Sequence, residues 1–423
     1  MPGDPMTQVR AAQLPAPGAP AVVAFGGGHG LAASLSALRR ITDRVTAVVT
    51  VGDDGGSSGR LRHELGALPP GDLRMALAAL AGSDQWSRTW TDVFQRRFVG
   101  GGPLAGHALG NLVLAALTEH VGSPVAALEL AAELLGACGR VLPLSEDGID
   151  IVAEVTGLDP DDPAATHQVR GQVAVATTRG SVREVWVEPA EPRVCAPACA
   201  AVEEADWLVL GPGSLYTSML PHLLVPEMHK VITGAAARRL VVLNLVAQPG
   251  ETEGFTPEAH LRVLAQHAPG FAVDVVLADP AAVPDPSALA AAAADLGAAL
   301  HLAPVRSADA AGVHDPLLLA AAFDAVFSAS GPVAGGIPGP PAGAEARTAR
   351  ATLTTESPVA HRGPGSAGEQ TSWSDDLPDR RRAGSARPIQ QGPRRRSGGS
   401  PVADPVGTPG PPDPRATARD LKE

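Results

Sequence analysis

The sequence predicts a doubly wound α/β domain with a mostly parallel sheet, a helical insertion and a small β subdomain. Three observations predict it. Short apolar runs recur through the middle of the chain and stop at glycine-rich or polar turns. Helical patterns separate most of these runs, and strands that are joined through helices pair in parallel. Hydrophobic periodicity ends near residue 330, where a segment rich in Pro, Gly and Arg begins.

Composition divides the chain into three parts. We expect residues 21–330 to form one domain. Residues 1–20 and 331–423 are expected to be disordered, because their composition buries too little apolar surface. The net charge of −12 argues against binding to nucleic acid or to an anionic membrane. The sequence has no signal-peptide pattern and no long uncharged apolar run, and its three cysteines lack framework spacing. We therefore expect a soluble, cytoplasmic protein.

The first elements form a βαβ unit. Residues 21–25 are an apolar strand that stops at a glycine loop, and a helical pattern follows to about Arg40. Residues 45–51 are a second buried strand, which stops at Gly52. The two strands should therefore be parallel, and the two loops should lie at the same edge of the sheet.

The later elements comprise an insertion, short strands and further βα units. Four helical patterns cover residues 71–82, 86–98, 107–121 and 123–137, and Asp72 is placed to cap the first. Short strands are predicted over residues 140–142, 149–156, 169–176 and 182–187. The sheet then resumes with strands over residues 207–210, 240–243, 273–277 and 300–305.

The first glycine loop is a candidate phosphate-binding site. It consists of Gly26, Gly27, Gly28, His29 and Gly30, between a strand and a helix. Glycines let backbone N–H groups approach an anion, and the helix N-terminus adds partial positive charge. The loop lacks the third glycine of the dinucleotide fingerprint, and no Gly-Lys-Ser/Thr follows it. A tight turn without a ligand is the structural alternative.

The second loop is acidic. Its carboxylates, those of Asp53 and Asp54, can accept hydrogen bonds from a ribose or a base, or hold a divalent cation on a diphosphate. Ser57 and Ser58 can donate to phosphate oxygens, and Arg60 offers a bidentate fork. A capped surface turn is the alternative, because Asp, Gly and Ser are common turn residues.

Two further loops follow later strands. Gly211, Gly213 and Ser214 belong to a Gly-Pro-Gly-Ser turn, and Asn244 ends the next strand. Ser214 is also a candidate helix cap. Open α/β sheets bind ligands at this edge, so the convergence of the loops predicts a binding crevice.

Other polar residues give no clear reaction. His107 and Asn111 open a predicted helix, where a cap or core hydrogen bond explains them as well as ligand contact does. The sequence contains no Ser-His-Asp order, metalloprotease motif or paired catalytic carboxylates. It therefore indicates a binding site more clearly than a reaction.

Six ordered blocks resemble the YvcK/CofD-like family, in particular its YvcK branch of gluconeogenesis factors. They are Gly26–Leu31, Val49–Leu61, Pro69–Arg74, Gly106–Asn111, Gly211–Ser218 and Asn244–Thr252. Two positions depart from the common form: His29 stands where Thr is usual, and Gly52 replaces Ala.

This resemblance implies a Rossmann-like core that binds UDP-sugars, UDP-N-acetylglucosamine and UDP-glucose among them. It also implies a regulator of cell shape and of envelope and peptidoglycan precursor synthesis, which needs no cofactor, acts through a protein partner and allows a homo-oligomer. The alternative is a 2-phospho-L-lactate transferase of the CofD type, with Mg²⁺ on Asp53 or Asp54 and a deazaflavin acceptor. A nicotinamide-dependent oxidoreductase is a third reading, which the wrong glycine fingerprint disfavours.

Overall fold

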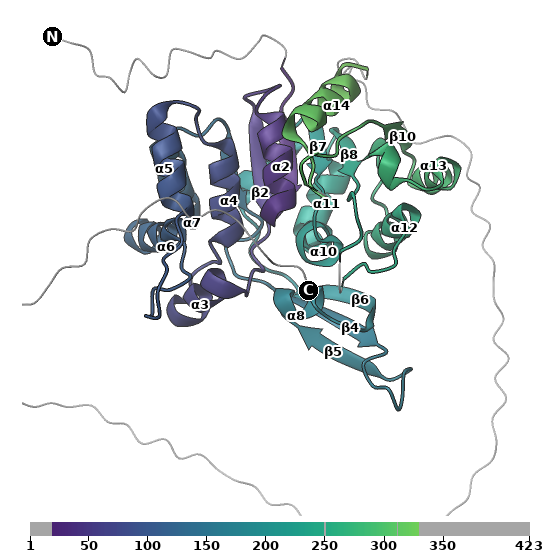
Figure 1. Cartoon of the computed structure of the whole chain (residues 1–423), viewed down its shortest axis with the longest axis horizontal. Helices are drawn as coiled ribbons and strands as arrows, with labels where there is room; N and C mark the ends of the chain where they lie inside the picture. The colour runs from purple at the N-terminus through teal and green to yellow at the C-terminus, as the bar shows by residue number, and fades with distance from the viewer. Residues whose placement is uncertain (1–18, 249–250, 311, 330–423) are drawn as a thin grey trace, which may run out of the picture. The chain divides into compact units, whose positions relative to one another are not determined.

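The computed structural model describes residues 19–248, 251–310 and 312–329. All of them belong to the first of two units of the chain, and the second unit, residues 340–423, lies outside the described residues. The terminal segments that the sequence predicts to be disordered also fall outside them, except for residues 19 and 20. Figure 1 shows the helices and strands of the described part.

A seven-stranded parallel sheet is the centre of the fold. Its strands are β1 (Val22–Gly26), β2 (Val45–Val49), β3 (Arg140–Pro143), β7 (Trp207–Leu210), β8 (Arg238–Val242), β9 (Val275–Ala278) and β10 (Ala299–Leu302). They lie in the order β10-β9-β8-β7-β1-β2-β3, and every neighbouring pair is parallel. The chain winds outward from β1 in one direction and then, from β7, in the other. The junction of β1 and β7 is therefore the topological switch point, and the doubly wound, Rossmann-like prediction is confirmed.

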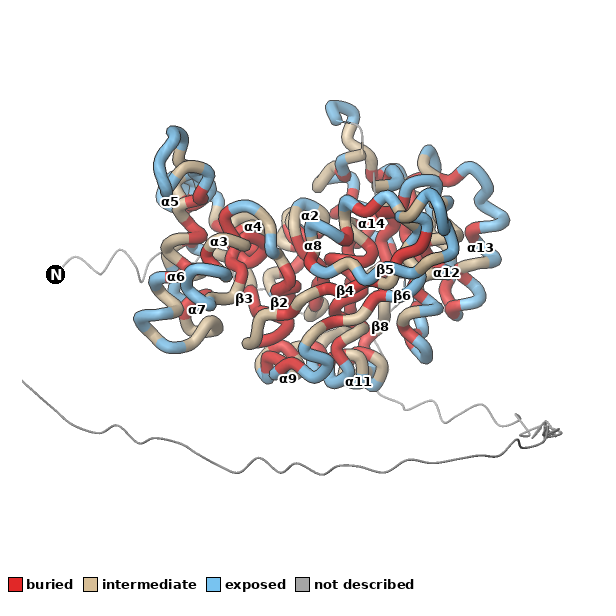
Figure 2. Tube along the Cα trace, turned by 90° about the horizontal axis from the view of Figure 1, so that it is seen from below, coloured by how far each residue is buried: buried red, intermediate tan, exposed pale blue. Residues whose placement is uncertain are grey.

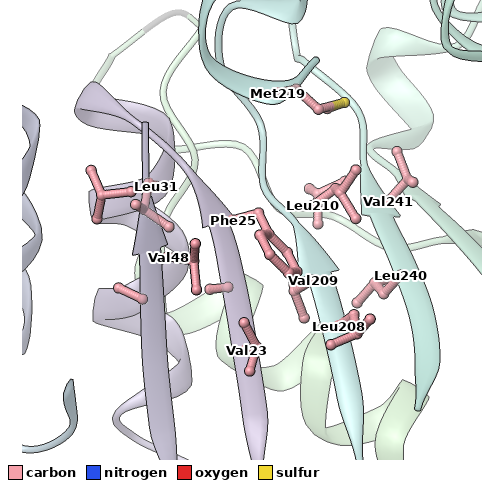
Figure 3. Close-up of a cluster of buried hydrophobic side chains, with 14 of the residues drawn as sticks. Val23, Phe25, Leu31, Val48, Leu208, Val209, Leu210, Met219, Leu240 and Val241 are labelled. Atoms are coloured by element: carbon pink, nitrogen blue, oxygen red, sulfur yellow. The ribbon is translucent and has the colours of Figure 1, made fainter. Parts of the chain in front are cut away.

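The inner strands are buried on both faces, as helix-covered parallel strands are. Phe25, Leu208, Leu210 and Val241 are all at most 1% exposed. Figure 3 shows these side chains filling the layer around β1, β7 and β8. Helix α2 (Gly28–Leu38) follows β1 directly and lies between α4 (Gly71–Leu80) and α14 (Pro316–Ala329).

The helical insertion lies between β2 and β3 in the sequence. It comprises α3 (Gly56–Leu65), α4, α5 (Gln85–Gln95), α6 (Leu109–Val121) and α7 (Pro124–Leu135). The four predicted helices are present, although α6 begins at Leu109 and Asp72 does not cap α4 with its side chain. Helix α3 was expected to be a loop, because its Gly-Ser-Ser-Gly start has low helix propensity. Burial of Ser57 and Ser58 and the left-handed cap at Gly66 (φ 63°) fix it as a helix instead.

A three-stranded antiparallel sheet forms the predicted β subdomain. Its strands are β4 (Asp150–Thr156), β5 (Thr166–Arg170) and β6 (Ser181–Glu188), in the order β5-β4-β6. The prediction of one strand over residues 169–176 is wrong. Strand β5 ends at Arg170, Gly171 has a φ of 101°, and α8 (Gln172–Ala176) follows. Glycine at this left-handed position lets the chain turn from strand into helix.

The remaining helices precede or connect the strands of the second half of the main sheet, β7 to β10. They are α9 (Ala196–Glu203), η1 (Leu215–Met219), α10 (Pro221–Leu224), α11 (Pro226–Gly234), α12 (Pro257–His267), η2 (Pro280–Ala282) and α13 (Pro286–Asp295). Figure 2 shows buried residues running through β2 and β4, while much of α5 and α13 is exposed. Among the described residues, no helix combines the length and apolar character needed to span a membrane.

Candidate functional site

The loops after β1 and β7 meet at the switch point. Gly26 and Gly28 have φ values of 146° and 58°, and α2 begins at Gly28. A Cβ atom on Gly30 would overlap the carbonyl oxygen of Pro212, so the two loop backbones are in direct contact there. Only glycine permits such an approach. The predicted convergence of these two loops at one edge of the sheet is therefore confirmed.

Asn244, at the carboxyl end of β8, holds the β7 loop in place. Its Oδ1 accepts from Gly213 N at 2.7 Å, and its Nδ2 donates to Gly213 O at 2.7 Å. Gly213 itself has a φ of 135°. The amide thus satisfies both backbone polar groups of one residue in a left-handed conformation. Asn244 therefore lies beside the β7 loop and fixes its conformation, and its contact with a ligand stays a prediction.

Ser214 caps the π-helix η1, which follows the β7 loop. Its Oγ accepts from Thr217 N at 3.0 Å and donates to Glu251 Oε1 at 2.5 Å. The same Glu251 oxygen accepts from Tyr216 N at 2.7 Å. Burial raises the pKa of Glu251, and these hydrogen bonds oppose the rise. Glu251 was not singled out as a site residue from the sequence, although it belongs to the Asn244–Thr252 block, and it follows the end of β8 by nine residues.

Asp53 and Asp72 lie together between the first two loops and the start of α4. Asp53 Oδ1 accepts from Gly55 N at 2.9 Å, and a Cβ on Gly71 would come within 2.6 Å of its other oxygen. Asp72 is 8% exposed, and a Cβ on Gly27 would overlap its Oδ2. That Oδ2 atom has no hydrogen-bond partner among the described residues. Asp72 therefore lines the first glycine loop rather than capping a helix.

Burial is the main reason that the pKa of Asp72 rises to about 7, and the negative charge of Asp53 adds to it. The Gly28 N–H and Arg74 oppose this rise. A carboxyl group that is poised near neutral pH, beside a second carboxylate in a crevice, is typical of a functional site. The sequence placed Asp72 at the start of a helix, and only the packing of α4 against the first loop brings it here.

Asp54 and Arg60 hold neighbouring segments instead of facing that pair. Asp54 is exposed, and its Oδ1 accepts from Val173 N at 3.0 Å in α8. Arg60 donates to Pro103 O at 3.1 Å and to Ala105 O at 2.8 Å. The two side chains connect the acidic loop to the β subdomain and to the loop before α6, and contact of either with a ligand stays a prediction.

Ser57, His107 and Asn111 form a buried chain of hydrogen bonds below the acidic loop. Arg74 Nε donates to Asn111 Oδ1 at 2.8 Å, and Asn111 Nδ2 donates to Ser57 Oγ at 3.0 Å. Ser57 Oγ lies 2.9 Å from His107 Nδ1. Because arginine can only donate, Asn111 Oδ1 accepts from Arg74 and Asn111 Nδ2 donates to Ser57 Oγ. The direction of the Ser57–His107 bond follows the tautomer of His107. Burial lowers the pKa of His107.

Ser58 supports the same loop, since its Oγ accepts from Gly71 N at 3.0 Å. The four polar residues Ser57, Ser58, His107 and Asn111 are all at most 5% exposed. The structural reading of His107 and Asn111 as core hydrogen-bonding residues therefore accounts for them. The network braces α3, α4 and α6 under the acidic loop.

Fold and site together define a doubly wound α/β protein with two glycine-rich loops in contact at its switch point and an acidic pair beside them. The family described as 2-phospho-L-lactate transferase CofD matches residues 22–308. The chain therefore belongs to the CofD family.

Its relatives carry the name of a gluconeogenesis factor. A Mycobacterium tuberculosis protein named "Putative gluconeogenesis factor" is 52% identical over 308 residues, which is 72% of this chain and 90% of that protein. The "Gluconeogenesis factor" of Bacillus subtilis is 38% identical over 266 residues, 63% of this chain and 80% of that protein. A crystal structure of a UPF0052 family member from Bacillus halodurans superposes with a TM-score of 0.63 at 33% identity, and covers 71% of this chain and 97% of its own.

Proposed function

We propose that the protein binds a nucleotide-sugar, of the UDP-linked kind, in the crevice at the junction of β1 and β7, and that it acts as a regulator. The direct backbone contact between Gly30 and Pro212 carries this proposal, because it joins two glycine-rich loops into one wall. Ligands of open α/β sheets bind at such switch points.

The diphosphate would lie at the N-terminus of α2. The first hydrogen bond of this helix runs from Leu31 N to Gly27 O at 3.3 Å, so the N–H groups that precede it have no partner inside the helix. No residue of α2 itself is acidic in this first turn, and the neighbouring Asp72 carboxyl, which interacts with the Gly28 N–H, has a pKa raised to about 7. These N–H groups and the helix dipole favour a phosphate there. The hydrogen bonds of Asn244 to Gly213 hold the opposite wall in a fixed shape before the ligand arrives.

The hydroxyl groups of a sugar would meet Asp53 and Asp72. Carboxylate oxygens are strong acceptors for hydroxyl donors. The unpaired Oδ2 of Asp72 is an acceptor of this kind beside the phosphate loop. This placement assigns the acidic pair, rather than Asp54, to ligand binding.

The regulatory part of the proposal rests on the relatives. Those of Bacillus subtilis and Listeria monocytogenes are named as gluconeogenesis factors. We extend the proposal to control of cell shape and of envelope precursor synthesis through a protein partner, in agreement with the resemblance of the six sequence blocks. Nucleotide-sugars are envelope precursors, so a protein that binds one can report its supply.

Calorimetric titration tests the proposal. Purified protein is titrated with UDP-N-acetylglucosamine and UDP-glucose, with and without Mg²⁺, and with NAD and a deazaflavin as controls. Saturable binding of the UDP-sugars alone, without turnover of the bound sugar, supports a regulator. Turnover of the UDP-sugar by the purified protein contradicts the regulatory reading.

A second candidate function is a metal-dependent transferase of the CofD type, which the Asp53–Asp72 pair favours. Mg²⁺ is commonly held by one or two carboxylates together with substrate phosphates and water. The unpaired, buried Asp72 Oδ2 beside Asp53 fits such an ion. These two residues would hold it, and it would neutralise charge on the phosphates. Deazaflavin binding that requires Mg²⁺ supports this candidate. An Asp72→Asn variant that keeps both deazaflavin binding and its Mg²⁺ requirement contradicts it.

A further inference from the structure

A cavity lies next to the crevice, at the carboxyl ends of β8 and β9. Its volume is about 60 Å³, and Asn244, Leu245, Phe255, His260 and Ala282 are among the residues that line it. Asn244 borders both the cavity and the β7 loop, where it contacts Gly213. The cavity therefore lies beside the β7 loop, on the side of β8 and β9.

The orientation of Asn244 is fixed by its partners. Gly213 N must donate and Gly213 O must accept, so the side-chain oxygen faces the former and the side-chain nitrogen the latter. The same Nδ2 lies 3.5 Å from His260 Nε2. Because Nδ2 can only donate, this contact favours an unprotonated His260 Nε2, which leaves the proton of the neutral ring on Nδ1.

His260 is a buried neutral donor in the wall of this cavity. It is 7% exposed, and burial lowers its pKa to about 4, so the ring is uncharged at neutral pH. Among the described residues its Nδ1 has no hydrogen-bond partner. The ring of Phe255 meets it edge to face at a centroid distance of 6.2 Å. An uncharged N–H between apolar and aromatic walls suits a flat, neutral ring that carries a carbonyl oxygen.

We propose that this cavity receives the nucleobase of the ligand, and that His260 Nδ1 donates to a carbonyl oxygen of the base. The inference rests on the proposed function and adds an orientation to it. With the diphosphate at the switch point, the base lies toward β8 and β9, and the sugar lies toward Asp53 and Asp72. A hydroxyl-rich sugar is matched to carboxylates, whereas an uncharged base is matched to a cavity that combines apolar residues with the polar side chains of Asn244 and His260.

Size and donor chemistry together favour a pyrimidine. A water-sized group needs about 10–15 Å³, so the cavity holds roughly four to six such groups, close to one six-membered ring. Uracil and cytosine present carbonyl oxygens to a donor. Adenine is larger and has no carbonyl oxygen. The protein should therefore bind UDP more tightly than ADP, by about tenfold or more.

Two pairs of variants separate the base site from the phosphate site. His260→Phe keeps the ring but removes the donor, and His260→Asn keeps a donor on a smaller side chain. Ala282→Leu adds bulk to the cavity wall and keeps the His260 side chain, and Ala281→Leu adds the same bulk at the exposed neighbouring position of η2. The thermal midpoint of each variant is measured first, so that folding is established before binding.

Each protein is titrated with UDP, UDP-N-acetylglucosamine and ADP. We expect His260→Phe and Ala282→Leu to weaken binding of both uridine ligands about tenfold and by the same factor, with less effect on ADP. His260→Asn should recover part of the loss, and Ala281→Leu should bind as wild type does. Unchanged uridine affinity in both folded cavity variants overturns the base assignment while leaving the proposed function intact. A wild-type protein that binds no nucleotide overturns both.

Discussion

The side-chain amide of Asn244 pairs with both backbone polar groups of Gly213, at 2.7 Å on each side. One residue at the end of β8 thereby fixes the loop that follows β7. The β7 loop in turn packs against Gly30 of the first loop. Three neighbouring strand ends are thus tied into one rigid edge, which is the preorganisation that a phosphate site needs.

Replacing Asn244 tests this connection between the end of β8 and the β7 loop. Asn244→Ala leaves the N–H and C=O of Gly213 without partners, so we expect a loss of about 1–3 kcal/mol in the free energy of unfolding. Binding of UDP-sugars should weaken at least tenfold, because the loop is no longer held. Urea unfolding and calorimetry measure the two effects. An unchanged affinity in a folded variant contradicts the role given to Asn244.

Gly30 is expected to tolerate no side chain. Gly30→Ala places a methyl group on the carbonyl oxygen of Pro212, which must then move and open the junction of the loops. We expect a loss of stability of about 1–3 kcal/mol and loss of nucleotide-sugar binding. Gly234→Ala is the matched control, since a Cβ there meets nothing within 4 Å. Equal behaviour of the two variants contradicts the close approach.

The pH dependence of stability reports the burial of Asp72. Its carboxyl ionises near 3.8 in the unfolded chain and near 7 in the folded protein, so the native state holds this proton more tightly. The contribution to stability is full below about pH 4 and is lost as the pH rises to about 7.

Asp72→Asn removes this titration. The variant should match wild type near pH 4 and exceed it by about 4 kcal/mol above pH 7, because the pKa rises from 3.8 to about 7 and each pKa unit is worth roughly 1.4 kcal/mol. Urea unfolding at pH 4.5 and pH 8 measures the difference. Asp295→Asn, at an exposed carboxylate in α13, is the control that should leave the profile unchanged. A constant difference between Asp72→Asn and wild type at both pH values contradicts the burial of this group.

Asp53 and Asp54 are adjacent in the sequence but are expected to behave differently. Asp53 faces Asp72 and Gly71, whereas Asp54 is exposed and bonds to Val173 N. Asp53→Ala should weaken UDP-sugar binding about tenfold, since an acceptor for a sugar hydroxyl is lost. Asp54→Ala should change affinity less than threefold. Calorimetry on both variants measures the two affinities. A larger loss of affinity in Asp54→Ala than in Asp53→Ala contradicts this assignment and indicates that Asp54 contacts the ligand.

Much of the sheet follows from local pattern. The apolar runs at 21–25, 45–51, 207–210 and 240–243 predict strands that are buried on both faces, and their glycine or polar ends mark the edge where the site lies. Helix α3 is missed because glycine and serine disfavour helices locally, while tertiary burial decides the outcome. The strand predicted at 169–176 fails at Gly171.

Residues of the site that lie far apart in the sequence are harder to predict. Asp72 reads as a helix cap and becomes a neighbour of Gly27 only when α4 packs beside the first loop. Glu251 comes to the site on the loop after β8 and His260 on α12, and no spacing rule connects them to Ser214 or Asn244. Sequence pattern therefore locates the edge of the sheet, and packing decides which polar side chains gather there.

The most direct test of the central claim is a calorimetric titration of UDP-N-acetylglucosamine into wild type, Gly30→Ala and Gly234→Ala. A crevice built by the contact of Gly30 with Pro212 predicts saturable binding to wild type and to Gly234→Ala, and none to Gly30→Ala. Binding of equal strength to all three proteins would contradict a nucleotide-sugar site at the junction of β1 and β7.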